Sequence, residues 1–152
     1  MPRIDIGKLA SRTSTAYPDQ FKPAVAGREK TALGNAAGLT QFGVNLTRLK
    51  PGAASALRHW HENEDEFVYV LEGELVLVED EGETILKAGG CAGFKANVAN
   101  GHQLVNRTNR DALILEVGTR APRERAHYPD VDLLYEVDGK NIRILHKDGT
   151  PY

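Results

Sequence analysis

Three histidines and one glutamate have the residue types and spacing of a metal site. His59 and His61 are one residue apart, Glu66 follows five residues after His61, and His102 lies further along the chain. Alternate side chains of a β-strand point to the same side, so both imidazoles of the pair share one face. Three imidazoles and one carboxylate form a mixed nitrogen and oxygen ligand set that suits a first-row transition metal. The residues therefore predict a metal site made by His59, His61, Glu66 and His102.

The position of Glu66 constrains the local structure. An odd separation from His61 would place Glu66 on the opposite face if one straight strand continued. The prediction therefore requires a turn within Glu62–Asp65, where Asn63 and Asp65 are suitable turn residues. The simplest interpretation of the other acidic residues here is as solvated turn charges: Glu62, Glu64 and Asp65. A second interpretation is that one of them, and not Glu66, is the metal ligand.

Plainer interpretations exist for the same histidines. His59 and His61 could be strand histidines that face solvent, and His102 could be a loop histidine beside Gly101. The spacing of the first two and the carboxylate that follows them favour a role as ligands. His127 and His146 have no partner pattern and are interpreted as structural or exposed.

Composition excludes several classes of protein. The chain has 152 residues, a formal net charge of −2 and an isoelectric point near 6.2, so nothing favours binding to nucleic acid or to an anionic membrane. No apolar run approaches the ~18 residues that span a bilayer. Cys91 is the only cysteine, so no internal disulfide can form, and we expect it to be a small buried residue. We expect one domain in the cytoplasm.

The elements that must position the ligands are short strands. Alternating or β-branched runs end at glycine-rich turns, and no segment has helical periodicity over three turns. Glu72-Gly73 and Asp138-Gly139 are interpreted as tight hairpin turns. Residues 1–40 are interpreted as loops with one short strand. The pattern predicts an all-β antiparallel sandwich or barrel of jelly-roll type. The expected strands are 42–49, 67–71, 75–78, 84–86, 91–94, 103–105, 112–117, 133–137 and 142–145.

Two of these strands are apolar on both faces. Residues 67–71 and 75–78 do not alternate as strands with one wet face would. A covering layer is therefore expected from the first forty residues, from the tail beyond Arg120, or from a second subunit. Trp60 lies between the two histidines of the pair and should point out of the barrel, which also favours a covering segment or a subunit contact.

The residues around the histidine pair resemble the first motif of the cupin superfamily. That motif is a glycine, a short spacer, His-x-His, three or four residues, glutamate, six residues and glycine. Here it reads Gly52, His59, His61, Glu66 and Gly73, with one extra residue between Gly52 and His59.

The second cupin motif is degraded in this chain. That motif is a glycine, five residues, Pro-x-Gly, a short gap, histidine, three residues and asparagine, of which Gly89, His102 and Asn106 match. Lys95 replaces the proline and Asn97 the glycine. Because asparagine tolerates the left-handed conformation, Asn97 is expected to preserve the turn. Lys95 could meet an anionic substrate near the barrel mouth, but a solvated surface lysine is favoured. Asn106 is interpreted as a structural residue that ties a turn.

The resemblance implies a fold and a range of chemistry. It implies a single-domain jelly-roll β-barrel that binds one divalent transition metal, Fe, Mn, Ni, Zn or Cu, and that forms a homodimer. It also implies similarity to small bacterial single-domain cupins without an assigned reaction. Cupins include dioxygenases, decarboxylases, isomerases and epimerases, and some members have no activity, so the fold is predicted better than the reaction.

These observations together give one organisation and several functional hypotheses. Residues 1–40 form an extension that packs on the barrel or on a partner subunit, residues 41–120 form the barrel, and residues 121–152 form a hairpin and tail of the same domain. The first hypothesis is a metal-dependent enzyme acting on a small polar or anionic metabolite, with dioxygenase or decarboxylase chemistry and sugar-phosphate isomerase chemistry equally supported. The alternatives are a non-catalytic binding or sensor protein and a metal-free structural barrel. No residue outside the ligand set can be nominated as a general base.

Overall fold

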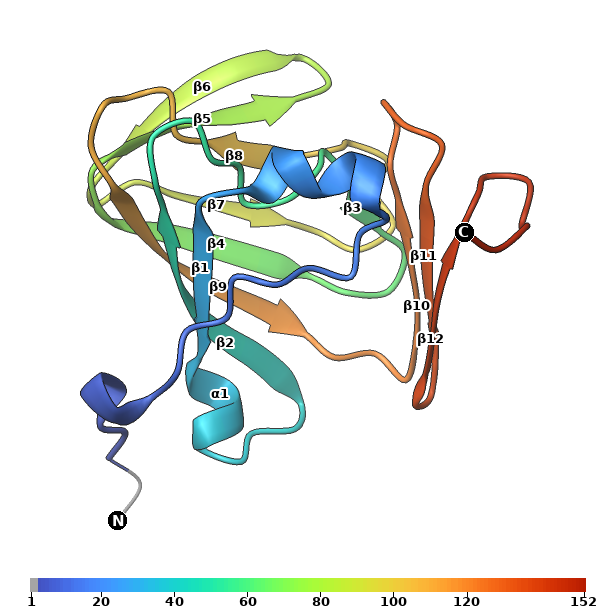
Figure 1. Cartoon of the computed structure of the whole chain (residues 1–152), viewed down its shortest axis with the longest axis horizontal. Coiled ribbons are helices and arrows are strands. Elements are labelled where there is room, and N and C mark those ends of the chain that lie inside the picture. Colours follow the sequence, from blue (N-terminus) through green and yellow to red (C-terminus); the bar gives the residue numbers. More distant parts are fainter. Residues whose placement is uncertain (1–2) are drawn as a thin grey trace.

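The computed structural model describes residues 3–152 and is built almost entirely of antiparallel strands (Figure 1). Within these residues the one α-helix, α1 (Leu33–Ala36), is short, and 3-10 helices span Ile6–Lys8 and Asp19–Val25. The all-β prediction is confirmed. The strands are β1 (Arg28–Ala32), β2 (Phe42–Leu49), β3 (Trp60–His61), β4 (Glu66–Glu72), β5 (Glu74–Glu79), β6 (Gly82–Lys87), β7 (Cys91–Phe94), β8 (Gln103–Val105), β9 (Ala112–Thr119), β10 (Arg123–His127), β11 (Leu134–Asp138) and β12 (Asn141–Leu145).

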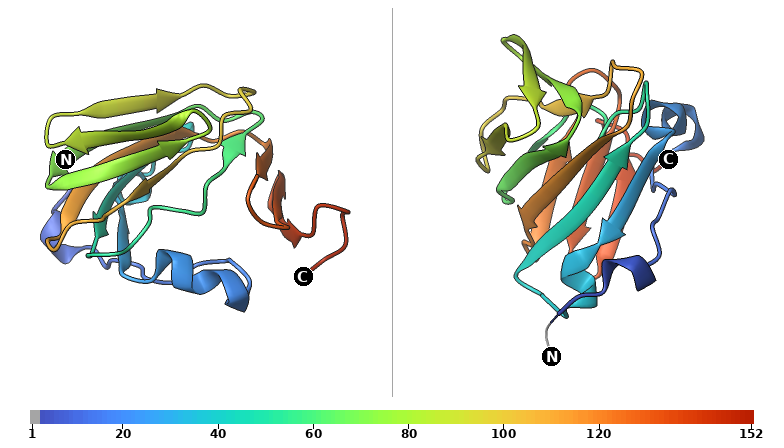
Figure 2. Two further views of the ribbon diagram at one scale, coloured as in Figure 1. Left: turned by 90° about the horizontal axis from the view of Figure 1, so that it is seen from above. Right: turned by 90° about the vertical axis from the view of Figure 1, so that its left-hand side faces the viewer.

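Two sheets enclose the main core. The larger sheet has the strand order β1-β2-β9-β4-β7, and the smaller has the order β6-β5-β8. Figure 2 shows them as layers that face each other. Both contribute fully buried side chains to one apolar cluster, Leu49 and Ile114 from the larger sheet and Leu75 and Leu104 from the smaller. Burial of this shared surface holds the sheets together as a barrel.

The chain passes from one sheet to the other at Gly73. The prediction of a tight hairpin at Glu72-Gly73 is wrong, because β4 pairs with β7 and β9, whereas β5 pairs with β6 and β8. Gly73 has φ of 81°, and a Cβ there would lie 2.9 Å from the carbonyl oxygen of Asp111. Only glycine accommodates both the left-handed backbone and this close approach. The glycine therefore marks a crossing between the two sheets.

A third sheet closes one end of the barrel and has the order β12-β11-β10-β3. The hairpin predicted at Asp138-Gly139 is confirmed, because β11 and β12 pair around it. Strand β10 lies where no strand was expected, and it pairs with β3 through Ala126 opposite His61. This pairing fixes the histidine pair against the C-terminal part of the chain.

The N-terminal segment lies along the barrel rather than apart from it. It contains the one short strand expected there, β1, at the edge of the larger sheet. The backbones of Arg12 and Lys30 exchange hydrogen bonds of 2.8 and 2.9 Å, and the ring of Tyr17 packs edge-on against Tyr128 at 5.9 Å. The segment therefore contacts both the larger sheet and the chain that follows β10.

The outer face of the larger sheet carries a row of exposed apolar side chains. Phe67, Tyr69 and Leu71 of β4 are 42%, 39% and 42% exposed. Cys91 lies opposite Tyr69 and is also exposed, so the prediction that it is buried is wrong. Strand β7 directs Ala92 and Phe94 toward the core, which leaves Cys91 on the outer face. The expected homodimer stays a prediction.

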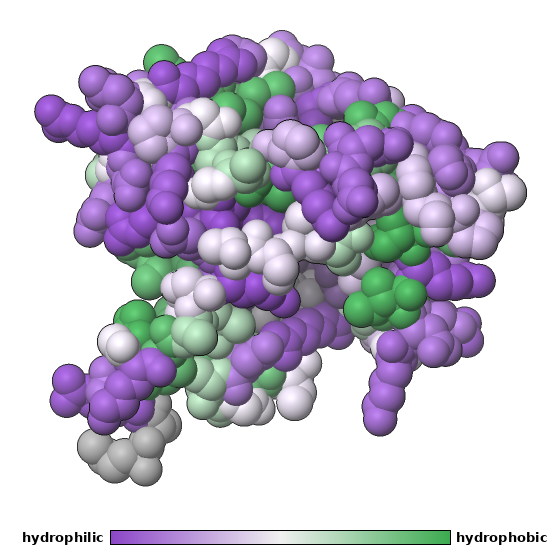
Figure 3. Space-filling view, viewed as in Figure 1, coloured by the Kyte–Doolittle hydropathy of each residue, from purple (hydrophilic) through white to green (hydrophobic). Residues whose placement is uncertain are grey.

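The rest of the surface is characterised by the hydropathy of its side chains and by the length of the helices. On the face drawn in Figure 3 hydrophilic side chains predominate, with hydrophobic patches between them. Among the described residues there is no helix with the length and apolar character needed to cross a lipid bilayer.

Candidate metal centre and its cavity

The four predicted ligands lie in or directly beside three different sheets. Strand β3 ends at His61 and β4 begins at Glu66, so the turn predicted within Glu62–Asp65 is confirmed. His59 precedes β3 and forms an isolated bridge with His102, which precedes β8. The structure therefore brings together residues that are up to 43 positions apart (59 to 102).

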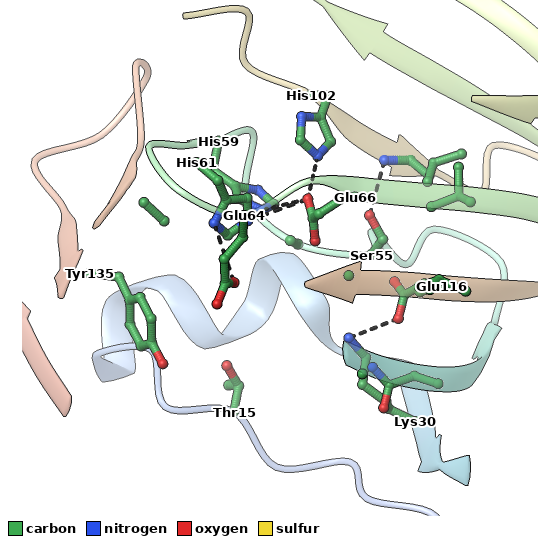
Figure 4. Close-up of a pocket in the computed structure, with 18 of the residues that line it drawn as sticks. Thr15, Lys30, Ser55, His59, His61, Glu64, Glu66, His102, Glu116 and Tyr135 are labelled. Atoms are coloured by element: carbon green, nitrogen blue, oxygen red, sulfur yellow. Dashed lines mark hydrogen bonds and ion pairs between the residues drawn. The ribbon is translucent and has the colours of Figure 1, made fainter. Parts of the chain in front are cut away.

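The side chains converge on one oxygen atom. Oε2 of Glu66 lies 2.8 Å from Nε2 of His102, 3.3 Å from Nε2 of His61 and 3.7 Å from Nε2 of His59. Figure 4 shows the histidines pointing toward this carboxylate from different directions. His59, His61 and Glu66 offer ligand atoms that all lie within 4.8 Å of one another. The cluster could hold a metal ion.

The hydrogen bonding of the rings fits such a role. Nδ1 of His59 donates to the carbonyl oxygen of Leu57 at 2.7 Å, which leaves the Nε2 lone pair directed into the cluster. Nδ1 and Nε2 of His61 and Nδ1 of His102 are buried, and within the described chain they make no hydrogen bond. Buried polar atoms without partners are costly, and a metal ligated by Nε2 would satisfy one of them. The donor set and its orientation therefore fit a divalent transition metal.

Burial and neighbouring charges set the protonation of the cluster. Burial lowers the pKa of His59 to about 4, against the opposing attraction of the Glu66 carboxylate. Burial also acts to lower the pKa of His61, but the carboxylates of Glu124 and Glu66 outweigh it and raise that pKa to about 10. Burial acts to raise the pKa of Glu66, but contacts with His102 and His61 hold it well below its usual range. At neutral pH the Glu66 carboxylate is ionised and His59 is neutral, the states that bind metals, whereas His61 carries a proton that a bound metal would displace.

Two further carboxylates lie beside His61, and the sequence analysis did not identify either. Glu124 of β10 has a side chain only 1% exposed, and its Oε1 lies 3.4 Å from Nδ1 of His61. Its two oxygens also accept the backbone N–H groups of Glu62 and Asn63, both at 2.9 Å. Glu124 thus holds the turn between the histidine pair and Glu66. Its place on an unexpected strand explains why no sequence signal pointed to it.

Glu64 is not the solvated turn charge that the sequence suggested. Its side chain is 22% exposed, Oε2 lies 4.0 Å from Nδ1 of His61, and Oε1 accepts the N–H of Ala121 at 2.9 Å. Burial raises the pKa of Glu64 above its usual value. The even spacing of Glu64 and Glu66 was a usable signal, because it places both carboxylates on the same side of an extended chain.

The altered second motif keeps its structural function. Asn97 has φ of 60°, as its replacement of a glycine predicted, and its N–H donates to the carbonyl oxygen of His61 at 2.8 Å. Phe94 stacks on the ring of His102 at 3.6 Å. Asn106 is fully buried and donates to two carbonyl oxygens, which confirms its structural role. Lys95 is exposed on the rim of a smaller cavity.

The remaining histidines have partners outside the cluster. The indole of Trp60 stacks on His127 at 4.3 Å, and His127 pairs with Glu62 at 2.7 Å. His146 pairs with Asp132 at 2.7 Å. The structural interpretation of both histidines is confirmed, and β10 is the segment against which Trp60 packs.

The cluster lies in the wall of a cavity of about 410 Å³. The N-terminal segment supplies part of the lining through Arg12, Thr15 and Tyr17, and β1 supplies Arg28 and Lys30. Figure 4 shows Thr15 and Tyr135 across the cavity from the histidines, with Lys30 and Glu116 on the side of β1 and β9. A small polar molecule could therefore reach the open side of a metal held by the cluster.

Comparison with known proteins gives the family. Residues 45–118 match the cupin domain model. The chain is also 48% identical to a solved structure from Silicibacter pomeroyi described as a sugar phosphate isomerase from a cupin superfamily, with 99% of this chain and 96% of that chain covered and a TM-score of 0.96. This chain is a cupin. The fold predicted from the two motifs is confirmed, and Arg12, Arg28, Lys30, Glu124 and Tyr135 lie outside the matched cupin domain.

Other cupins resemble the chain less closely. An Acidithiobacillus ferrooxidans structure, assigned provisionally as a sugar phosphate isomerase, is 26% identical over 82% of this chain and 80% of that chain, with a TM-score of 0.75. A Thermotoga maritima structure, whose assignment as an oxalate decarboxylase is itself a prediction, is 22% identical over 78% of this chain and 99% of that chain, with a TM-score of 0.63. At that identity only the fold is shared. Among curated proteins none matches this cupin.

Proposed function

We propose that this cupin is a metal-dependent isomerase that interconverts the aldose and ketose forms of a phosphorylated sugar. The observation that carries the proposal is the position of the His/Glu cluster in the wall of a polar cavity, beside a further carboxylate. The description of the Silicibacter pomeroyi protein supports it, because the similarity extends over nearly the whole of both chains.

The chain's own residues would hold the metal at His59, His61, Glu66 and His102. A divalent metal bound there supplies Lewis-acid stabilisation of negative charge on a carbonyl or hydroxyl oxygen. The hydrogen bond from His59 to Leu57 and the contact between His61 and Glu124 orient two of the imidazoles.

An aldose–ketose interconversion also needs a group that moves a proton between neighbouring carbon atoms. Glu64 is the best-placed carboxylate for this task, because it lines the cavity and one oxygen is fixed by the N–H of Ala121. Glu116 also lines the cavity, but it is held by Lys30 at 2.9 Å and by Thr47 at 2.7 Å. In the proposed reaction Glu64 takes the proton from the second carbon of the aldose and returns it to the first, while the proton of the hydroxyl on the second carbon passes to the carbonyl oxygen of the first.

The other chemistries considered from the sequence have weaker support. The likeness to the Thermotoga maritima protein shows a shared barrel and carries no reaction to this chain. For a protein that binds a ligand without converting it, no feature of the described residues gives specific support. Both alternatives become outcomes of the experiment below.

The test uses purified protein whose metal content has been measured. Aldose phosphates of four to six carbons are incubated with it in D₂O, and the ketose product and deuterium incorporation at the carbon next to the carbonyl are followed by NMR. We expect conversion by the wild type and a loss of at least about 100-fold for Glu64→Gln. Glu62→Gln is the matched control, because Glu62 pairs with His127 and does not line the cavity. Tight binding without conversion of any sugar phosphate would contradict the proposal and favour a binding protein.

A further inference from the structure

One end of the cavity is rich in cations. Arg12, Arg28 and Lys30 line it, and none of them belongs to the matched cupin domain. Arg12 lies on the N-terminal segment, while Arg28 and Lys30 lie on β1. The two backbone hydrogen bonds between Arg12 and Lys30 hold the segment in register with the strand. The extension therefore brings side chains to the cavity that the barrel itself does not supply.

The hydrogen bonds of these cations leave donors free. Nη1 of Arg28 donates to the carbonyl oxygen of Ser55 at 2.6 Å, which uses one of the five N–H groups of the guanidinium. Nζ of Lys30 pairs with Glu116 at 2.9 Å. Within residues 3–152 the side chain of Arg12 makes no hydrogen bond or ion pair. The cavity thus presents unused guanidinium donors beside a half-buried ammonium group.

The charges at this end do not balance. Three cations face one carboxylate, that of Glu116, which leaves a local excess of two positive charges. A phosphate monoester carries about −1.5 to −2 at pH 7 and offers three acceptor oxygens. We propose that Arg12, Arg28 and Lys30 form a subsite that binds the phosphate group of the substrate. The inference rests on the proposed function, and it assigns the two ends of the substrate to the two ends of the cavity.

The geometry of the donors favours phosphate over a carboxylate. Guanidinium groups bind phosphate oxygens in pairs, and two arginines with one lysine supply more donors than a single carboxylate can accept. Figure 4 shows Lys30 on the β1 side of the cavity and the histidines on the opposite side, with Ser55 between them in this view. A substrate with its phosphate near Lys30 would extend its carbon chain toward His61 and Glu64.

A second, smaller cavity of about 200 Å³ is the rival location. It shares His61, Glu64 and His102 with the larger cavity, and Lys95 is the only lysine or arginine in its lining. Glu79 also lines it and offsets that charge. A doubly charged phosphate is therefore favoured at the basic end of the larger cavity.

The test measures the binding of inorganic phosphate to the metal-loaded protein by calorimetry and by ³¹P NMR. Arg12→Gln and Lys30→Gln should each weaken the affinity about tenfold, which corresponds to about 1.4 kcal/mol. Arg110→Gln and Lys140→Gln are matched controls, because both residues are exposed and lie outside the cavity. These controls, and Lys95→Gln, should bind phosphate as the wild type does. Arg12→Gln is the decisive variant, because the exposed side chain of Arg12 makes no hydrogen bond or ion pair within residues 3–152 whose loss would disturb the fold.

Wild-type affinity in both Arg12→Gln and Lys30→Gln would overturn the proposal, since phosphate held on the metal alone would not respond to them. A loss confined to Lys95→Gln would also overturn it and move the phosphate to the smaller cavity. The outcome for the isomerase reaction can be told apart from the outcome for the phosphate subsite. If phosphate binding depends on Arg12 and Lys30 but no sugar phosphate is converted, the subsite stands and the reaction is wrong. If an unphosphorylated sugar is isomerised as well as its phosphate, the isomerase stands and the subsite is wrong.

Discussion

Replacing Glu124 by alanine should weaken metal binding, although all four predicted ligands are retained. The carboxylate accepts two N–H groups from the turn that joins the histidine pair to Glu66, and it lies 3.4 Å from Nδ1 of His61. Its removal loosens the turn and takes away the group that orients the His61 ring. Losing such a partner of a metal-binding histidine typically costs about 10–100-fold in affinity.

The same substitution should also destabilise the metal-free protein. Hydrogen bonds to a charged acceptor are worth about 1.5–3 kcal/mol each when they are buried. Glu62 is half-buried and Asn63 is exposed, so water can replace part of what their N–H groups lose. We therefore expect a loss of about 3 kcal/mol for Glu124→Ala. Glu124→Gln retains one acceptor oxygen and should lose about half as much.

The assay is competition for Zn²⁺ against a chromophoric chelator, with urea unfolding of the metal-free protein measured in parallel. Glu136→Ala is the matched control. Glu136 is also a buried glutamate of the C-terminal sheet, but it pairs with Arg125 and Arg143, both at 2.6 Å, and does not contact the turn. The substitution Glu136→Ala should lower the free energy of unfolding and leave the Zn²⁺ affinity unchanged. Equal Zn²⁺ affinities in Glu124→Ala and Glu136→Ala would refute the role given to Glu124.

Four shorter predictions follow from other parts of the molecule. Asn106→Ala should lower the free energy of unfolding by about 3 kcal/mol, because a fully buried amide loses its bonds to backbone carbonyls; a loss below about 1 kcal/mol in urea unfolding would contradict this. Asn97→Ala should cost about 1–2 kcal/mol through its φ of 60°, whereas Asn97→Gly should be nearly neutral in the same assay. The hydrogen bond and charge of Arg58 lower the pKa of Asp130 below its usual 3.8. The wild type should therefore be more stable than Asp130→Asn by a constant amount above pH 3.8, and this difference should disappear as the pH falls through the lowered pKa of Asp130. Thermal unfolding of both proteins across pH 2–7 measures it. Cys91 should react with a thiol reagent in the folded protein as readily as in urea, and protection by the fold would contradict its exposed position.

Much of the barrel could be predicted from local patterns. The strand from Phe42 ends just before the Pro51-Gly52 turn, and the strands from Cys91 and Gln103 begin just after glycines. The parity of His61 and Glu66 predicts the turn between them. Asn97 could be placed in the left-handed region because asparagine tolerates it better than most residues. These features depend on neighbouring residues, which the sequence displays directly.

The errors concern partners that are distant along the chain. Glu72-Gly73 has the composition of a hairpin, but the neighbouring strands join different sheets, and only packing around the core decides that. Strand β10 is a charged segment whose strand conformation depends on pairing with β3 and β11. Glu124 and the basic residues of β1 were missed for the same reason, because their proximity to the cavity arises only from tertiary structure.

The position of the four predicted ligands in or beside three sheets has a consequence for how the molecule unfolds. His61 lies in the C-terminal sheet, Glu66 begins a strand of the larger sheet, and the bridged residues His59 and His102 directly precede β3 and β8. An ion bound by all four would add its binding free energy to the contacts between sheets and make the fold open as a single unit. Without the ion, the C-terminal sheet has its own small core, built on Tyr128 and Leu133, and can separate first. Chelation would then change the number of steps in which the structure melts, as well as its stability.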